Sequence, residues 1–146
     1  MTVTTGNELG WLLDRALGSV EGVRHAVLMS SDGLLHSRTA GIGQDEAEKF
    51  AAITAAVRAA ALAYDEETGG GGTRQALIEL TNHVGLITQA GGNTMLSVQT
   101  SGPDADIGLI THHMLELAQR VGHEMKVAPR QPSEPGLPTT LGLPTT

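Results

Sequence analysis

The stretch HAVLMSSDGLLHS, residues 25–37, places an apolar run, a turn signal and a second apolar run within thirteen positions. The segment 23–30 is rich in β-branched and aliphatic residues, which predicts a strand buried on both faces. Asp32 and Gly33 tolerate the positive φ angles that tight hairpins require. The chain is therefore expected to return as a second strand over 34–38 and to form an antiparallel hairpin.

The same stretch contains the residue types of a serine hydrolase. Such a site needs serine, histidine and aspartate within hydrogen-bond reach, together with an oxyanion hole. Ser30, Ser31 and Asp32 are consecutive at the expected hairpin tip, where each side chain points its own way. His25 lies about 16 Å away along an extended strand, at ~3.3 Å per residue, and His36 lies back along the second strand. The sequence has no G-x-S-x-G motif, so a simple turn is favoured over a catalytic site.

Segments on both sides of the hairpin show regular periodicity. The expected order is helix, two strands, helix, three strands, helix (α-β-β-α-β-β-β-α). This order predicts an α+β fold in which a five-stranded antiparallel sheet carries helices on both faces. The expected helices are 7–18, 44–65 and about 103–125. Pro103 lies in the first turn of the last helix. The three later strands are expected at 74–80, 83–89 and 94–99.

Composition restricts the classes of function. The chain has 146 residues and a formal net charge of −7, so binding to nucleic acid or to an anionic membrane surface is not expected. It has no cysteine, which fits a reducing cytoplasm. The N-terminus does not resemble a signal peptide, and no apolar run approaches the roughly 20 residues of a membrane span. We expect a cytoplasmic protein without direct membrane insertion, recruited to membranes only through its partners.

The last part of the chain differs in composition from the rest. Residues 127–146 hold five of the six prolines and contain the sequence GLPTT twice. This segment has too little apolar surface to offset the entropy of ordering. The sequence therefore predicts one domain over 1–126 and a disordered Pro/Thr-rich tail over 127–146.

Two further motifs have features of ligand sites. The run GGGGTR at 69–74 lacks the lysine of a phosphate-binding loop and follows a helix instead of preceding one, so it is interpreted as a linker. On the last helix, His112 and Glu116 have a spacing that a metal ion can bridge, with His113 and His123 nearby. No third strong ligand is evident, and a polar helix face is favoured. We expect no metal, cofactor or catalytic residues.

The helix expected over 44–65 is apolar on more than one side. Thirteen of the fifteen residues from Phe50 to Tyr64 are apolar, the exceptions being Thr54 and Arg58. A helix on one face of a sheet needs a single apolar stripe. The stripe expected on the sheet is Phe50, Ile53, Val57, Ala60, Ala61 and Tyr64. The second side is formed by Ala47, Ala51, Ala55, Ala59 and Leu62, and it either contacts a second copy or a partner, or is simply exposed to solvent.

The order of these elements resembles a known family. The segment LGWLLDRALGSVEGVRHAVLMSSDGLLHS, the alanine-rich helix and the strand pair HVGLITQAGGNTMLSV are similar to a roadblock/dynein-light-chain domain. The similarity covers about residues 5–125 and is greatest to the roadblock proteins of actinobacterial conservon operons. These operons also encode a sensor-kinase-like protein and a small Ras-like GTPase.

The resemblance implies a profilin-like fold and a homodimer in which central helices pack side by side and an edge strand pairs across the dimer. It also implies a non-enzymatic regulator or scaffold of a small Ras-like GTPase, in a bacterial signalling complex that includes the sensor-kinase-like protein. The alternative is a small-molecule or metal-sensing domain on the same fold. By position, the resemblance places the dimer or partner contacts at Ala47, Ala51, Thr54, Ala55, Arg58, Ala59, Leu62, Arg74, Ala76 and Ile78.

Overall fold

The computed structural model describes residues 7–127, with the surroundings of side chains given for 7–123. The strands form one five-stranded antiparallel sheet in the order β2-β1-β5-β4-β3. The strands are β1 (Val23–Ser30), β2 (Leu35–Arg38), β3 (Gln75–Glu79), β4 (Val84–Gln89) and β5 (Thr94–Thr100). The helices are α1 (Gly10–Leu13), the π-helical turn η1 (Asp14–Gly18), α2 (Gln44–Thr68) and α3 (Ile107–Val127).

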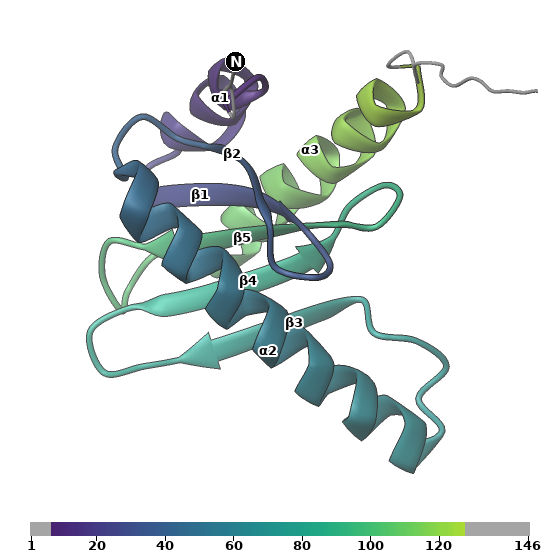
Figure 1. The fold of residues 1–146 in the computed structure, drawn as a ribbon. Coiled ribbons are helices and arrows are strands. Elements are labelled where there is room, and N and C mark those ends of the chain that lie inside the picture. The colour runs from purple at the N-terminus through teal and green to yellow at the C-terminus, as the bar shows by residue number, and fades with distance from the viewer. Residues whose placement is uncertain (1–6, 128–146) are drawn as a thin grey trace, which may run out of the picture.

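The helices cover both faces of the sheet, as the sequence predicted. In Figure 1, α2 crosses the near face, and α1 and α3 lie behind the sheet. The predicted α+β fold and the predicted order of elements are thereby confirmed. The predicted disorder of 127–146 lies outside the described residues, apart from Val127, at which α3 ends.

Two aliphatic cores flank the sheet because successive residues of a strand point to opposite faces. Beneath α1 and α3, the core includes Leu28, Leu86 and Leu96 from the strands, and all three side chains are fully buried. Beneath α2, the second core includes Val27 and Met95. The second core is smaller, and alanines form much of the contribution that α2 makes to it.

The hairpin between β1 and β2 has the predicted form. The amide of Ser30 donates to the carbonyl of Leu34 at 2.9 Å, and Gly33 adopts a φ of 93°. The Ser30 hydroxyl donates to the carboxylate of Asp32 within the turn. Because this bond satisfies both side chains locally, the serine and the aspartate stabilise the hairpin.

Two helical segments differ from the sequence prediction. The segment expected as one helix over 7–18 is a single α-helical turn followed by η1, which is wider because its hydrogen bonds span five residues. The last helix begins at Ile107 and not at Pro103. The carboxylate of Asp106 accepts a hydrogen bond from the amide of Leu109 at 3.1 Å and caps the helix there.

Within residues 7–127, none of the helices is both long enough and apolar enough to cross a membrane.

Candidate functional site

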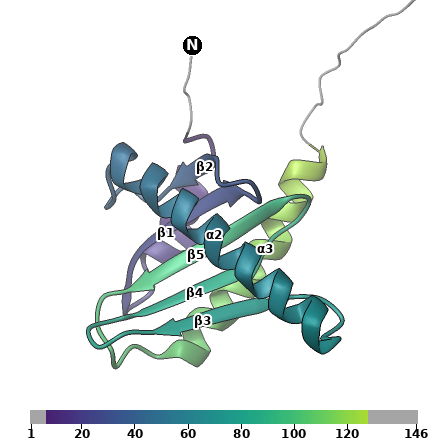
Figure 2. The same ribbon diagram turned by 60° about the horizontal axis from the view of Figure 1, so that its bottom comes forward.

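The central helix α2 extends past the sheet that it covers. Its 25 residues span about 37 Å at 1.5 Å per residue. Figures 1 and 2 show the C-terminal half of α2 projecting beyond β3, the last strand of the sheet. Only the N-terminal half of the helix therefore has the sheet beneath it along its whole width.

Small side chains form the inner side of α2. Ala47 and Ala51 are fully buried, and Thr54 is 2% exposed, with its hydroxyl 3.4 Å from that of Ser97 on β5. Ala55 is half-buried, and a Cβ added at Gly33 would meet its methyl group at 3.2 Å. Small residues let the helix approach the sheet and the β1–β2 hairpin closely.

This arrangement corrects the predicted contacts of α2. Ala47, Ala51 and Thr54 were expected at a dimer or partner interface, but they are buried against the chain's own sheet. Of the stripe expected on the sheet, Phe50 and Val57 pack against the core beneath α2, but Ile53 is 60% exposed and Tyr64 is 73% exposed. The prediction failed because alanine permits close packing on a sheet as readily as on a second helix.

The outward side of α2 is apolar and uncovered. Its residues follow one another at helical spacing along the helix and are all exposed in this structure. We call this surface the outer face of α2, and it comprises Ala52, Ile53, Ala56, Ala59, Ala60, Ala63 and Tyr64. The sequence inference that α2 is apolar on two sides is correct, although the residues were only partly assigned to the right side. Phe50 and Val57 pack on the core as expected and Ala59 lies on the outer face, whereas Ala47 and Ala51 face the sheet.

A groove opens beside this face, between the projecting half of α2 and β3. It has a volume of about 830 Å³. Ala60, Ala61 and Tyr64 line it from the helix, and Ala76 and Ile78 line it from the strand. The sheet of the described residues ends at β3, whose hydrogen-bonded neighbour is β4 on the other side. The open edge of β3 and the groove thus form one continuous surface with the outer face of α2.

The remaining predicted interface residues lie on or near this surface. Ala59 and Arg74 are exposed, and Leu62 is half-buried. The guanidinium of Arg58 donates from Nε to the side-chain carbonyl of Gln89 at 3.1 Å, so it is held against β4. The structure therefore brings Arg74, Ala76 and Ile78 together at the groove and leaves Ala59 on the outer face.

The glycine-rich loop closes the groove at one end. The carboxylate of Asp65 accepts a hydrogen bond from the amide of Gly72 at 2.9 Å, and its backbone carbonyl accepts one from Gly70 at 3.0 Å. Gly69 ends the helix with a φ of 67°, a conformation that favours glycine. The loop folds back on the end of α2, which agrees with its interpretation as a connector.

Sequence reasoning missed Ala60, Ala61 and Tyr64 as surface residues because it assigned them to the sheet. Leu77 on β3 is 52% exposed and was also missed. The length of the helical pattern was the available signal, since a helix much longer than the sheet is wide must leave part of its apolar side uncovered.

The residues considered for catalysis are not brought together. His25 is buried in edge-to-face contact with Phe50, with ring centroids 5.3 Å apart. The Nδ1 atom of His36 lies 2.8 Å from the hydroxyl of Ser37, which also accepts a hydrogen bond from the amide of Leu9. Ser37 thus fixes the N-terminal segment to β2, and no Ser-His-Asp arrangement exists among residues 7–123.

The histidines of α3 lie at the surface. His112 and Glu116 are 3.4 Å apart, with side chains 66% and 61% exposed. The rings of His112 and His113 are in edge-to-face contact, with centroids 5.7 Å apart. Over the part of the chain with described side chains, no three histidine, aspartate or glutamate residues are grouped so that they could hold a metal ion.

Comparison with known proteins identifies the domain. The model of the family described as the roadblock/LC7 domain matches residues 9–100. A roadblock/LC7 domain structure from Streptomyces avermitilis is 29% identical, with a TM-score of 0.77, and the match covers 83% of this chain and 100% of that one. A second domain from the same organism is 31% identical, covering 78% of this chain and 98% of that one, with a TM-score of 0.64.

The Myxococcus xanthus protein MglB shares the fold at 15% identity, with a TM-score of 0.73 and a match that covers 84% of this chain and 98% of MglB. No curated protein sequence matches the chain significantly. The family model matches most of the chain, and the fold is shared with both Streptomyces domains. The chain therefore belongs to the roadblock/LC7 domain family.

Proposed function

We propose that this protein is a non-enzymatic homodimer that regulates or scaffolds a small Ras-like GTPase. The observation that carries the proposal is the apolar outer face of α2, which joins a groove and the open edge of β3. The family to which the chain belongs consists of regulatory and scaffold proteins. In this proposal the GTPase and the sensor-kinase-like protein belong to the same bacterial signalling complex.

The geometry supports self-association through this surface. An exposed apolar strip along most of a helix is unfavourable for an isolated soluble protein and marks an interaction site. Five of the seven residues of this face are alanines, so two such helices can approach closely, and an open sheet edge can add a strand from a partner. A solved MglB structure, which shares this fold at 16% identity, has a tetrameric arrangement. This precedent supports self-association as a property of the fold.

The dimer can be tested with one charge placed on the outer face of α2. Ala60 is exposed in the single chain, so Ala60→Glu is compatible with folding. In a dimer the same carboxylate is buried without a partner, which is strongly unfavourable. We expect light scattering at micromolar concentrations to show a dimer for the native protein and a monomer for Ala60→Glu.

The matched control is Ser101→Glu, which adds the same charge at an exposed turn between β5 and α3. This variant should remain dimeric. A native protein that is monomeric over the whole concentration range contradicts the homodimer, and a dimeric Ala60→Glu variant shows that the interface lies elsewhere.

The GTPase partner is tested separately by affinity capture from lysate of the native host. The tagged protein is incubated with lysate containing either GDP or a non-hydrolysable GTP analogue, and bound proteins are identified by mass spectrometry. A small GTPase enriched in one nucleotide state, whose purified form then binds directly, supports a regulator. Equal binding in both states supports a scaffold. Absence of any GTPase, with the protein folded and dimeric, contradicts the proposal.

A further inference from the structure

A second hollow lies on the opposite face of the sheet from α2. It has a volume of about 540 Å³ and lies between the N-terminal helical segment and α3. Volumes of this size are typical of sites for small organic ligands. Because α2 and β3 do not line it, the hollow stays open when a partner covers the outer face of α2. Its lining residues are Arg15, Ala16, Ser19, Val20, His113, Glu116, Leu117, Gln119 and Arg120.

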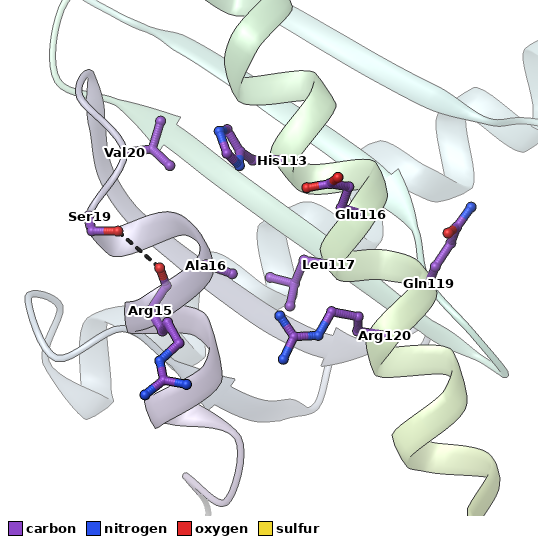
Figure 3. Close-up of a pocket in the computed structure, with 9 residues that line it drawn as sticks. All are labelled: Arg15, Ala16, Ser19, Val20, His113, Glu116, Leu117, Gln119 and Arg120. Atoms are coloured by element: carbon purple, nitrogen blue, oxygen red, sulfur yellow. Dashed lines mark hydrogen bonds between the residues drawn. The ribbon is translucent and has the colours of Figure 1, made fainter.

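The floor of the hollow is apolar and its rim carries hydrogen-bond donors. Ala16, Val20 and Leu117 form the apolar part. Figure 3 shows Arg120 and His113 extending from α3 toward the N-terminal helical segment. Arg15 lies on the facing wall, so one arginine from each of two separate elements lines the hollow. In Figure 3 the Arg15 side chain runs along its own wall, whereas Arg120 extends across the hollow.

Neither arginine is neutralised by a nearby carboxylate. Among residues 7–123, Arg15 and Arg120 form no ion pair. Asp14, next to Arg15, accepts a hydrogen bond from the amide of Ala40 at 2.9 Å and is directed to that loop. Glu116 lines the hollow, but its carboxylate lies 3.4 Å from His112. The hollow is thus lined by two arginines and one glutamate, a formal net charge of +1 in a chain whose net charge is −7.

The wall that carries Arg15 has an uncommon backbone. Arg15 and Ala16 belong to η1, and π-helical turns inside helices are rare and occur frequently at functional sites. The guanidinium of Arg15 lies 6.0 Å from the centre of the Trp11 ring, which is within cation–π distance. The hydroxyl of Ser19 donates to the carbonyl of Arg15 at 2.9 Å and closes the turn.

We propose that this hollow binds a phosphate monoester that carries a small apolar group. A phosphate monoester has close to two negative charges at neutral pH, and an arginine on each wall of the hollow favours such an anion. Arginine binds phosphate oxygens through two parallel hydrogen bonds, and His113 can donate to a further oxygen. The apolar floor accepts the organic part of the ligand. The phosphate group belongs either to a free small molecule or to a phosphorylated serine of another protein.

Phenyl phosphate is a suitable probe because it joins a phosphate to a small apolar ring. Backbone amide signals of the full chain are followed by NMR during titration with phenyl phosphate, inorganic phosphate or benzoate. We expect saturable shifts at Ser19, Val20, His113 and Arg120 with phenyl phosphate, and weaker binding of the other two probes. A peptide with one phosphoserine then distinguishes the source: tighter binding than phenyl phosphate indicates a phosphorylated protein, and weaker binding indicates a free small molecule.

Arginine variants test the assignment. Arg15→Ala and Arg120→Ala each remove one charge-assisted contact and should weaken the binding of phenyl phosphate about tenfold. Both side chains are exposed, so the variants should fold, which thermal unfolding checks. The matched control is Arg24→Ala, which removes an exposed guanidinium outside the hollow and should leave affinity within about twofold of the native protein.

Three results would overturn the proposal. The first is that millimolar phenyl phosphate causes no saturable shifts at the hollow. The second is that benzoate or inorganic phosphate binds as tightly as phenyl phosphate. The third is that Arg24→Ala loses as much affinity as Arg15→Ala and Arg120→Ala. The proposal is independent of the homodimer, because Arg15→Ala and Arg120→Ala should not change the molecular mass measured by light scattering.

Discussion

The imidazole of His25 lies beneath α2, 5% exposed, and within the described residues its Nδ1 atom has no hydrogen-bond partner. Burial and the positive charge of Arg24 hold the pKa of His25 below the ordinary value of 6.5, and His83 acts in the same direction. Glu46 opposes them by favouring the charged form. His25 is therefore neutral in the folded protein near neutral pH.

This lowered pKa predicts a pH dependence of stability. Below pH 6.5 the unfolded chain binds a proton at His25 that the folded chain does not, so the free energy of unfolding decreases as the pH falls from 6.5 toward the folded-state pKa. Above pH 6.5 this contribution is constant. Urea unfolding at pH 7.5, 6.5 and 5.5 measures the change.

The variant His25→Leu isolates the contribution of this side chain. It keeps an apolar group against Phe50 and removes the titrating group, so its stability should fall less between pH 6.5 and 5.5 than that of the native protein. His36→Gln, which removes a partly exposed histidine from β2, serves as the control and should keep the native pH dependence. The interpretation is refuted by an unchanged pH dependence in His25→Leu.

At the level of elements, the turn between β4 and β5 touches α3 through two glycines. A Cβ atom added to Gly91 would overlap the backbone of Gly122 in α3. Gly91→Ala should therefore force α3 away from the turn and reduce the free energy of unfolding by about 2 kcal/mol, as overpacking does in other proteins. Chemical denaturation measures this loss.

Gly102→Ala is the matched control for that substitution. A Cβ at Gly102 would meet no atom within 4 Å, so this variant should stay within about 0.5 kcal/mol of the native protein. If the two alanine variants are equally stable, the close approach of Gly91 to Gly122 does not constrain the position of α3.

The sequence predicted the strands more fully than it predicted the orientation of α2. Strands such as β1 and β5 were found from their β-branched and aliphatic runs because burial on both faces leaves a continuous apolar signal. The faces of α2 were partly misassigned because periodicity marks which residues share a side but not which side meets the sheet. Ala51 and Ile53 are both apolar, and the close fit that favours the smaller residue is a three-dimensional property.

The candidate surface was partly predictable for a related reason. Arg74, Ala76 and Ile78 were located on an edge strand through the family resemblance, and the structure places them at the groove. Tyr64 was missed because its exposure depends on where the sheet ends relative to α2. The hollow near Arg15 and Arg120 had no sequence signal, since these residues are 105 positions apart and meet only through the packing of α3 against the N-terminal segment.

For the whole molecule, the uncovered outer face of α2 couples folding to association. If two chains bury this surface between them, unfolding releases two monomers, and stability depends on protein concentration. A tenfold increase in concentration should raise the apparent free energy of unfolding by about 1.4 kcal/mol per dimer. The midpoint of urea unfolding, measured over a hundredfold range of concentration, should increase accordingly.

Variants at two sites separate this effect from aggregation. Ser101→Glu should keep the concentration dependence, because Ser101 belongs neither to the outer face of α2 nor to the groove, whereas Ala60→Glu should unfold with a midpoint that does not change with concentration. Such a result would mean that the alanine-rich side of α2 contributes to stability mainly in the assembled protein. A midpoint of the native protein that is independent of concentration would instead mean that the outer face of α2 stays exposed and is reserved for a different partner.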